Sequence, residues 1–301
     1  MDTNPETRIL YADPDELNLT HTLTPGQSFR WKQDERNRWI GVIGDKVIRI
    51  WHEGTHIGYQ AFPDGDSESI LREYFRLDVC LADLYRDFVD ADPRMADIIV
   101  RFKGLRLLRQ DPTETLLSYI CSAANSVPRI SNAVEIISAL YGNPITVIDG
   151  QKYYSFPAID ALLGMDVAHT AKLCGLGFRC RKLYAVAEQL YEKPCGWLDS
   201  LREASYDEAR LELLKINGVG MKIADCVLLF SLDKDEAFPV DTHIRKVAVN
   251  YYMPEFKQKT LTPAVYNQII SYFQYKFGPY AGWAQEYIFY DDLLKRQKEA
   301  V

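Results

Sequence analysis

A lysine and an aspartate have the types and spacing for chemistry on a sugar–phosphate substrate. Lys222 falls in the first turn of a helix that we expect after the GVG turn at 218–220, and Asp241 follows 19 residues later at the start of another helix. A buried lysine near a helix start loses its proton more easily, and the free amine forms Schiff bases with carbonyl carbon. A carboxylate can oppose positive charge that develops at a sugar carbon. Asp241 also suits a helix N-cap, which stabilises by about 1 kcal/mol.

The GVG turn suggests how such a substrate is held. Its glycines permit a tight left-handed turn, Val219 can anchor that turn in the core, and the next helix then directs its amides outward. A helix N-terminus suits a phosphate, so Gly218, Gly220 and Ile223 are candidate phosphate-binding positions, together with His243. An ordinary glycine-capped helix connection stays open as the alternative for the turn alone.

The cysteines set limits on metal chemistry. Cys226 lies four residues after Lys222 and shares its helix face, although a small core residue is the simpler reading. The six cysteines form no CxxC pair, which argues against a zinc ribbon, and none follows Cys226. We expect reduced thiols and no cofactor or catalytic metal.

Charge and composition limit the partners. The chain has 35 basic and 42 acidic residues, so nucleic acid could be bound only through a local patch. No apolar run is long enough to span a bilayer, and the start MDTNPETR lacks the features of a signal or transit peptide. We expect a cytoplasmic, nucleoid-associated monomer without membrane contact. Two basic clusters could serve as the patch: Arg101, Lys103, Arg106 and Arg109, and Arg179, Arg181 and Lys182.

The pattern of elements predicts an α+β protein that is mainly α. The first 60 residues alternate apolar and polar positions, with a hairpin turning at Gly44-Asp45 and a further strand at 56–62. From Ser67 the apolar spacing is helical, interrupted by short Gly/Pro breaks such as 142–144. We therefore expect an antiparallel sheet with flanking helices over 1–112. A helical region over 113–301 would form two subdomains with the active-site cleft between them.

Five motifs in order carry a family resemblance. The chain resembles the helix-hairpin-helix DNA glycosylase superfamily and, more narrowly, the 8-oxoguanine DNA glycosylase/AP lyases. The motifs are PGQSFRW at 25–31, ICS at 120–122, the segment 176–179, ADC at 224–226 and GPYAGWAQ at 278–285, beside the hairpin and PVDTH.

The resemblance implies a bifunctional repair enzyme that acts on duplex DNA containing 8-oxoguanine. Lys222 would attack the sugar C1′ and expel the base, and Asp241 would stabilise the oxocarbenium-like charge. The resulting imine would undergo β-elimination, which nicks the strand.

The resemblance also assigns a base pocket. Gly26 would place its carbonyl against N7–H of 8-oxoguanine, a hydrogen that guanine lacks, and losing that bond costs about 1–3 kcal/mol. Cys226 and Phe289 would sandwich the flipped base, Gln285 would read its Watson–Crick edge, and Pro239 would line the pocket. Without the resemblance, core packing is the preferred interpretation of Phe289.

The positions that would face the opposite strand depart from the family. Arg129 and Arg179 match the arginines that hold the orphaned cytosine, and Phe178 stands where the wedge is usually Tyr. Ala124 replaces an Asn that contacts the cytosine, so we expect weaker discrimination of the opposite base. Asn217 stands in the hairpin where Pro is usual.

Three other functions could be compared with this sequence. The endonuclease III and adenine glycosylase branches carry four cysteines after the Asp for an iron–sulfur cluster, and these are missing here. The alkylation-repair branch usually lacks the lysine. A non-catalytic helix-hairpin-helix module that only binds DNA or protein would suit the net charge of −7 but not the pairing of Lys222 with Asp241.

Overall fold

The N-terminal part of the chain forms a five-stranded antiparallel sheet. The computed structural model describes residues 5–123 and 125–299. The strand order is β1-β5-β4-β3-β2, in which all neighbours are antiparallel. The strands are β1 (Arg8–Leu10), β2 (Trp31–Gln33), β3 (Trp39–Ile43), β4 (Lys46–Glu53) and β5 (His56–Phe62). The hairpin predicted at Gly44-Asp45 and the strand predicted at 56–62 are both confirmed.

Apolar side chains are buried on both faces of this sheet. Successive side chains of a strand point to opposite faces, so neighbouring residues of β4 enter different clusters. Ile48 and Ile50 of β4 face α1 (Leu19–Leu23) and α2 (Glu68–Tyr74) in one apolar cluster. Val47 faces the other way, into a second cluster with Ile148 and Tyr153. The sheet is therefore buried on both sides rather than on one.

The second face of the sheet packs against a β-hairpin that was not predicted from the sequence. Strands β6 (Pro144–Ile148) and β7 (Gln151–Tyr154) pair within a region where we expected only helices and short breaks. Asp149 and Gly150 both have positive φ, as a two-residue hairpin turn requires, and Asp149 also pairs with Arg49 of β4 at 2.5 Å. The Asp-Gly pair between β-forming residues was the available signal.

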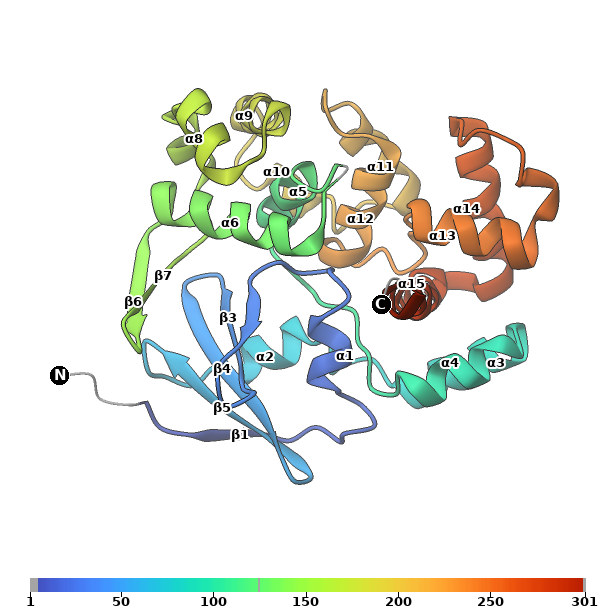
Figure 1. The fold of residues 1–301 in the computed structure, drawn as a ribbon, viewed down its shortest axis with the longest axis horizontal. Helices are drawn as coiled ribbons and strands as arrows, with labels where there is room; N and C mark the ends of the chain where they lie inside the picture. Colours follow the sequence, from blue (N-terminus) through green and yellow to red (C-terminus); the bar gives the residue numbers. More distant parts are fainter. Residues whose placement is uncertain (1–4, 124, 300–301) are drawn as a thin grey trace.

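The rest of the chain is helical, and the predicted class is confirmed. In the view of Figure 1, α8 and α9 stand at one end of the helical part and α13 and α14 at the other, with α5 and α12 between them. The helices are α3 (Leu81–Ala91), α4 (Arg94–Arg101), α5 (Pro112–Ile120), α6 (Val127–Tyr141), α7 (Ile159–Leu163), α8 (Val167–Cys174), α9 (Phe178–Tyr191), α10 (Trp197–Ser200), α11 (Tyr206–Leu214), α12 (Met221–Ser231), α13 (Thr242–Val247), α14 (Pro263–Phe277) and α15 (Ala281–Glu299), with short helical turns η1 (Ala248–Tyr252), η2 (Pro254–Phe256) and η3 (Gly278–Tyr280).

One large core joins these helices. It includes α3 and α4, whose buried Phe88 and Met95 belong to the same apolar cluster as Phe273 of α14 and Trp283 of α15. The helices α5 and α12 pack against each other in its centre. In the described ranges, no helix has the length and apolar character needed to cross a membrane.

Candidate active site

The turn between α11 and α12 is held by a side chain from α9. Gly218 has φ +105°, which favours glycine, and Val219 is buried in the core as expected. Gln189 brackets Asn217: its Oε1 accepts from the Asn217 amide at 2.8 Å, and its Nε2 donates to the Asn217 carbonyl at 3.0 Å. Proline has no amide hydrogen, so this clamp explains how the hairpin uses Asn217.

Lys222 occupies the first turn of α12, as predicted. Gly220 is the N-cap of the helix, and Lys222 is partly buried. Its Nζ lies 4.6 Å from the centre of the Tyr119 ring, over an aromatic face that attracts a cation. Tyr119 is in turn stacked on Phe230 of the same helix as Lys222. The amine is thus placed above a rigid aromatic floor.

Asp241 is the N-cap of α13, so the simpler reading of this residue is correct. Its Oδ1 accepts a hydrogen bond from the Ile244 amide at 2.8 Å. Asp241 also lines the cavity that Lys222 enters. Both roles foreseen for the carboxylate are geometrically compatible, since the cap uses only one oxygen.

A buried network fixes the segment before Asp241 against α12. The Val240 amide donates to the Tyr266 hydroxyl at 3.1 Å, and that hydroxyl donates to Asp225 Oδ2 at 2.8 Å. Arg210 donates to the same carboxylate at 2.6 Å. Asp225 lies between Lys222 and Cys226 in the helix that carries both. The network therefore sets the position of Asp241 relative to Lys222.

All five predicted base-binding residues and both predicted catalytic residues line one cavity of about 1020 Å³. It lies where the loop before β2, the start of α6, α12, the segment before α13 and the last helix meet. Its lining includes Gly26, Tyr119, Val127, Gly220, Lys222, Ile223, Cys226, Pro239, Asp241, His243, Gln285, Glu286 and Phe289. A volume of this size can hold a nucleobase with its sugar.

The loop with Gly26 is anchored by its neighbour. The Gln27 side chain is buried and makes three backbone hydrogen bonds, to the carbonyls of Thr22 and Arg106 and from the amide of Leu108. Gly26 has φ +93°, and a Cβ there would lie 2.7 Å from Val127. Glycine is thus required both for the backbone conformation and for the space.

The carbonyl of Gly26 already has one partner. It accepts a hydrogen bond from the Tyr119 hydroxyl at 3.2 Å. A carbonyl oxygen has two lone pairs, so a second donor can bind there. Tyr119 therefore links the loop of Gly26 to the floor beneath Lys222, a role that its sequence context did not reveal.

The last helix presents Gln285 and Phe289 on one face, as their spacing predicted. Gln285 is 4% exposed, and its Nε2 donates to the Pro239 carbonyl at 3.3 Å. Its Oε1 has no hydrogen-bond partner among the described residues. Phe289 is partly buried and meets the His243 ring edge-on, with centroids 5.3 Å apart. His243 Nδ1 is paired with Asp292 at 2.8 Å.

Burial raises the pKa of several groups that line the cavity, and two of them, Cys226 and Glu286, bear on the chemistry. Burial raises the pKa of the Cys226 thiol to about 12, and the nearby Lys222 ammonium only partly offsets this. Cys226 is therefore a neutral thiol rather than a competing nucleophile. Burial also raises the pKa of Glu286 to about 8, with the charge of Asp241 adding to the effect and that of Lys222 opposing it. No motif or spacing in the sequence singled out Glu286.

The residues predicted to face the opposite strand lie elsewhere, around the start of α9 and of α6. Phe178 is 59% exposed, and the Arg179 guanidinium lies 4.9 Å from its ring centre while donating to the carbonyls of Ala123 and Leu176. Arg129 is exposed near the start of α6. None of the three lines the cavity with Lys222. Ala124, on which the expectation of weak opposite-base discrimination rests, lies outside the described residues.

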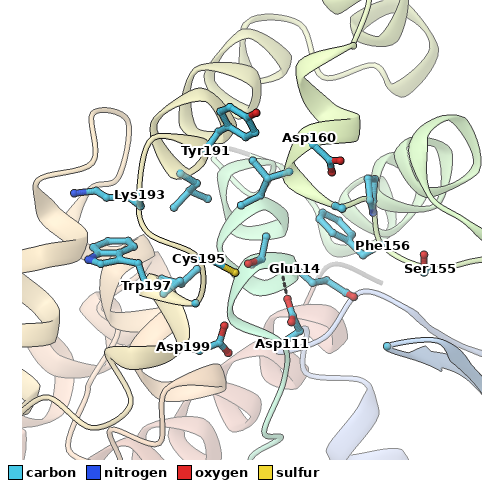
Figure 2. Close-up of a pocket in the computed structure, with 18 of the residues that line it drawn as sticks. Asp111, Glu114, Ser155, Phe156, Asp160, Tyr191, Lys193, Cys195, Trp197 and Asp199 are labelled. Atoms are coloured by element: carbon cyan, nitrogen blue, oxygen red, sulfur yellow. Dashed lines mark hydrogen bonds between the residues drawn. The ribbon is translucent and has the colours of Figure 1, made fainter.

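A second cavity, of about 620 Å³, lies between α5, α7 and the α9–α10 connection. Figure 2 shows the carboxylates of Asp111, Glu114, Asp160 and Asp199 around it, with Lys193 on one side. With Asp45, five acidic residues line this cavity beside one lysine, so it does not suit the phosphate backbone of DNA. Among the residues that the structure describes, no cluster of three His, Cys, Asp or Glu side chains could hold a metal ion.

The fold and the cavity together define a helix-hairpin-helix glycosylase architecture. Comparison with known proteins identifies the family within this class. Residues 9–116 match the family model for the 8-oxoguanine DNA glycosylase N-terminal domain. An N-glycosylase/DNA lyase of Arabidopsis thaliana is 35% identical over 286 residues, covering 92% of this chain and 78% of that protein. An N-glycosylase/DNA lyase of Saccharomyces cerevisiae is 32% identical over 324 residues, covering 94% and 85%.

A solved structure agrees with the sequence relatives. The 8-oxoguanine glycosylase/lyase of Clostridium acetobutylicum, in complex with dsDNA containing cytosine opposite 8-oxoG, matches with a TM-score of 0.84 at 30% identity and 93% coverage of each chain. This chain therefore belongs to the 8-oxoguanine DNA glycosylase/lyase family, and the resemblance inferred from its motifs is confirmed.

Proposed function

We propose that this chain, an 8-oxoguanine N-glycosylase/DNA lyase by family, excises the damaged base from duplex DNA with Lys222 as its nucleophile. The observation that carries the proposal is the shared cavity: Lys222 and Asp241, 19 residues apart in sequence, line it together with the groups expected to hold the base. A module that only binds DNA has no need for an amine and a carboxylate in one largely apolar cavity.

The chemistry follows from these two groups. The free amine of Lys222 forms a bond to C1′, the C1′–N9 bond breaks, and its electron pair leaves with the base. The carboxylate of Asp241 opposes the positive charge that develops on the sugar, an interaction that is strong in a cavity with little water. The Lys222 nitrogen then loses a proton and its lone pair opens the C1′–O4′ bond, with O4′ taking up a proton, which gives an iminium. Loss of a C2′ proton from this iminium expels the 3′ phosphate and nicks the strand.

The base would lie between the Cys226 thiol and the Phe289 ring. The carbonyl of Gly26 retains a lone pair for N7–H, and the unpaired Oε1 of Gln285 can accept from the Watson–Crick edge. Pro239 completes the wall, with its carbonyl orienting the Gln285 amide. Guanine lacks the N7 hydrogen and would leave the Gly26 carbonyl facing an acceptor.

We place the opposite strand against Phe178, Arg179 and Arg129. An exposed phenyl ring can fill the gap that a flipped nucleotide leaves, and the arginine donors can contact the unpaired base. With Ala124 in place of an amide, opposite-cytosine preference should be weak. Turnover on 8-oxoguanine opposite C that exceeds the other three pairs by several orders of magnitude would contradict this.

The phosphates flanking the lesion would bind at two places. The amides of Gly218, Gly220 and Ile223 lie at the turn and first turn of α12, where the helix dipole favours an anion. His243 would add a contact from α13. We further propose that the chain acts as a monomer and that residues 1–112 and 113–301 form its two organisational parts.

The experiment is borohydride trapping on a duplex with one 8-oxoguanine opposite C. Wild type should give a covalent adduct, and Lys222→Gln should give none while still binding the duplex. Lys215→Gln is the matched control, because this exposed lysine lies in the same hairpin and pairs only with Glu212 in the structure's described part. An adduct that persists in Lys222→Gln, or its absence from wild type, would refute the assignment.

A further inference from the structure

Glu286 is a buried carboxyl group in the active-site cavity for which the chemistry above has no use. It lies on α15 directly after Gln285, lines the cavity and is 2% exposed. Its Oε1 has no hydrogen-bond partner among the described residues. A buried polar atom without a partner is destabilising, so its presence in a reaction cavity calls for a function.

Four titratable groups surround it, each from a different position in the site. Asp241 at the start of α13 and Lys222 of α12 act on it with opposite sign, as described above. Burial raises the pKa of Tyr119 of α5 and of Tyr290, one turn further along α15, and the charge of Glu286 adds to both shifts. The carboxyl group is therefore close to the two reacting side chains rather than to the surface.

Its proton affinity gives it a defined state at neutral pH. With a pKa of about 8, Glu286 is mostly protonated at pH 7. Two neighbouring carboxyl groups in which burial keeps one neutral form an acid and a charge stabiliser, the arrangement that cleaves glycosidic bonds.

We propose that Glu286 is the general acid that protonates the departing base. As the Lys222 amine bonds to C1′ and the C1′–N9 bond breaks, the base leaves with the electron pair and takes the proton of the Glu286 carboxyl group. The products are the neutral base, a Glu286 carboxylate and a positively charged Lys222 nitrogen on the sugar. The negative charge on Glu286 thus forms near the positive charge on the Lys222 nitrogen, and the attraction between the two charges favours the step. This inference rests on the proposed role of Lys222.

The helix geometry favours this assignment over base reading. Gln285 and Phe289 lie at i and i+4 and share one face, whereas Glu286 is turned by about 100° from Gln285. The charges of Asp241 and Lys222 both act on the Glu286 carboxyl group, so it lies near these two groups rather than on the face shared by Gln285 and Phe289.

The test measures base release and strand nicking separately, under single-turnover conditions, for wild type, Glu286→Gln and Glu286→Asp. Glutamine keeps the volume and polarity but has no proton to give, so base release at pH 7 should fall by about 100-fold. Aspartate should recover part of the loss. Nicking of a preformed abasic site, which needs no leaving base, should stay at the wild-type rate in Glu286→Gln.

The pH profile gives an independent readout. Wild-type base release should fall about tenfold per pH unit above pH 8, as the acid is lost, and Glu286→Gln should lack this fall. Glu73→Gln, a change of an exposed carboxylate on α2, is the control for loss of a charge and should match wild type.

Two results would overturn the inference. One is base release by Glu286→Gln at the wild-type rate across the pH range. The other is an equal loss of base release and abasic-site nicking, which would mean that Glu286 acts on Lys222 and not on the base. A wild-type protein that releases no 8-oxoguanine would instead refute the proposed function itself.

Discussion

The perturbed carboxyl group of Glu286 makes a prediction about stability as well as rate. In the folded state it titrates at about 8, whereas in an unfolded chain it would titrate near 4.5. Between these two values the unfolded chain has released a proton that the folded protein still holds. The free energy of unfolding therefore falls as pH rises through this window, and the loss levels off above pH 8.

The magnitude follows from the two values. At about 1.4 kcal/mol per pH unit above 4.5, Glu286 lowers the free energy of unfolding by roughly 3 kcal/mol at pH 7. Glutamine does not titrate, so Glu286→Gln should be more stable than wild type by roughly this amount at pH 7 and equally stable at or below pH 4.5. A site that is optimised for chemistry commonly has such a cost in stability.

Urea unfolding of wild type and Glu286→Gln at several pH values between 4.5 and 8 tests this. The difference in unfolding free energy should grow with pH for Glu286→Gln and stay near zero for the exposed control Glu73→Gln. A difference that is constant with pH, or that favours wild type at pH 7, would show that Glu286 is not a buried neutral acid, and the proton-donor inference would lose its physical basis.

Three further predictions concern the framework of the site. Asp241→Asn keeps the helix cap and Asp241→Ala loses about 1 kcal/mol of stability, yet both should slow base excision on the order of 100-fold in single-turnover assays; a fast Asp241→Asn would remove the carboxylate from the mechanism. Asp225→Ala leaves Arg210 without its buried partner and should lower the unfolding free energy by about 3–5 kcal/mol in urea titrations. Gly26→Ala places a methyl group against Val127 at a positive φ, so excision should fall and Val127→Ala should restore only part of it; full restoration would show that space alone matters.

The proposed reactive pair could be recognised from local sequence because each residue lies at a helix start that its own neighbours in the chain indicate. Lys222 follows a glycine turn that starts a helix, and Asp241 is followed by the residues that it caps. Both signals extend over fewer than ten residues. The family motifs added the base pocket, and the structure brings all five of the predicted pocket positions into one cavity or its wall.

The misses have a different physical origin. The β6–β7 hairpin carried an Asp-Gly turn signal, but its strands are stabilised by the far face of a sheet that lies a hundred residues earlier, through Arg49 and Asp149. Glu286 and Tyr119 carry no motif of their own. Their roles depend on groups from other helices that approach them in the folded chain.

The sequence by itself determined the class of fold, the hairpin and the family, and it singled out the two residues proposed to react, because periodicity, turn residues and motifs act over short distances. Only the tertiary structure decided which side chains share a cavity, that Gln189 holds the hairpin at Asn217, and that Asp225 and Tyr266 fix the segment before Asp241. The tertiary structure also raises the pKa of Glu286 to about 8, so that its carboxyl group is mostly protonated at pH 7. Proton affinity depends on burial and on neighbouring charges, and both are properties of the packed molecule.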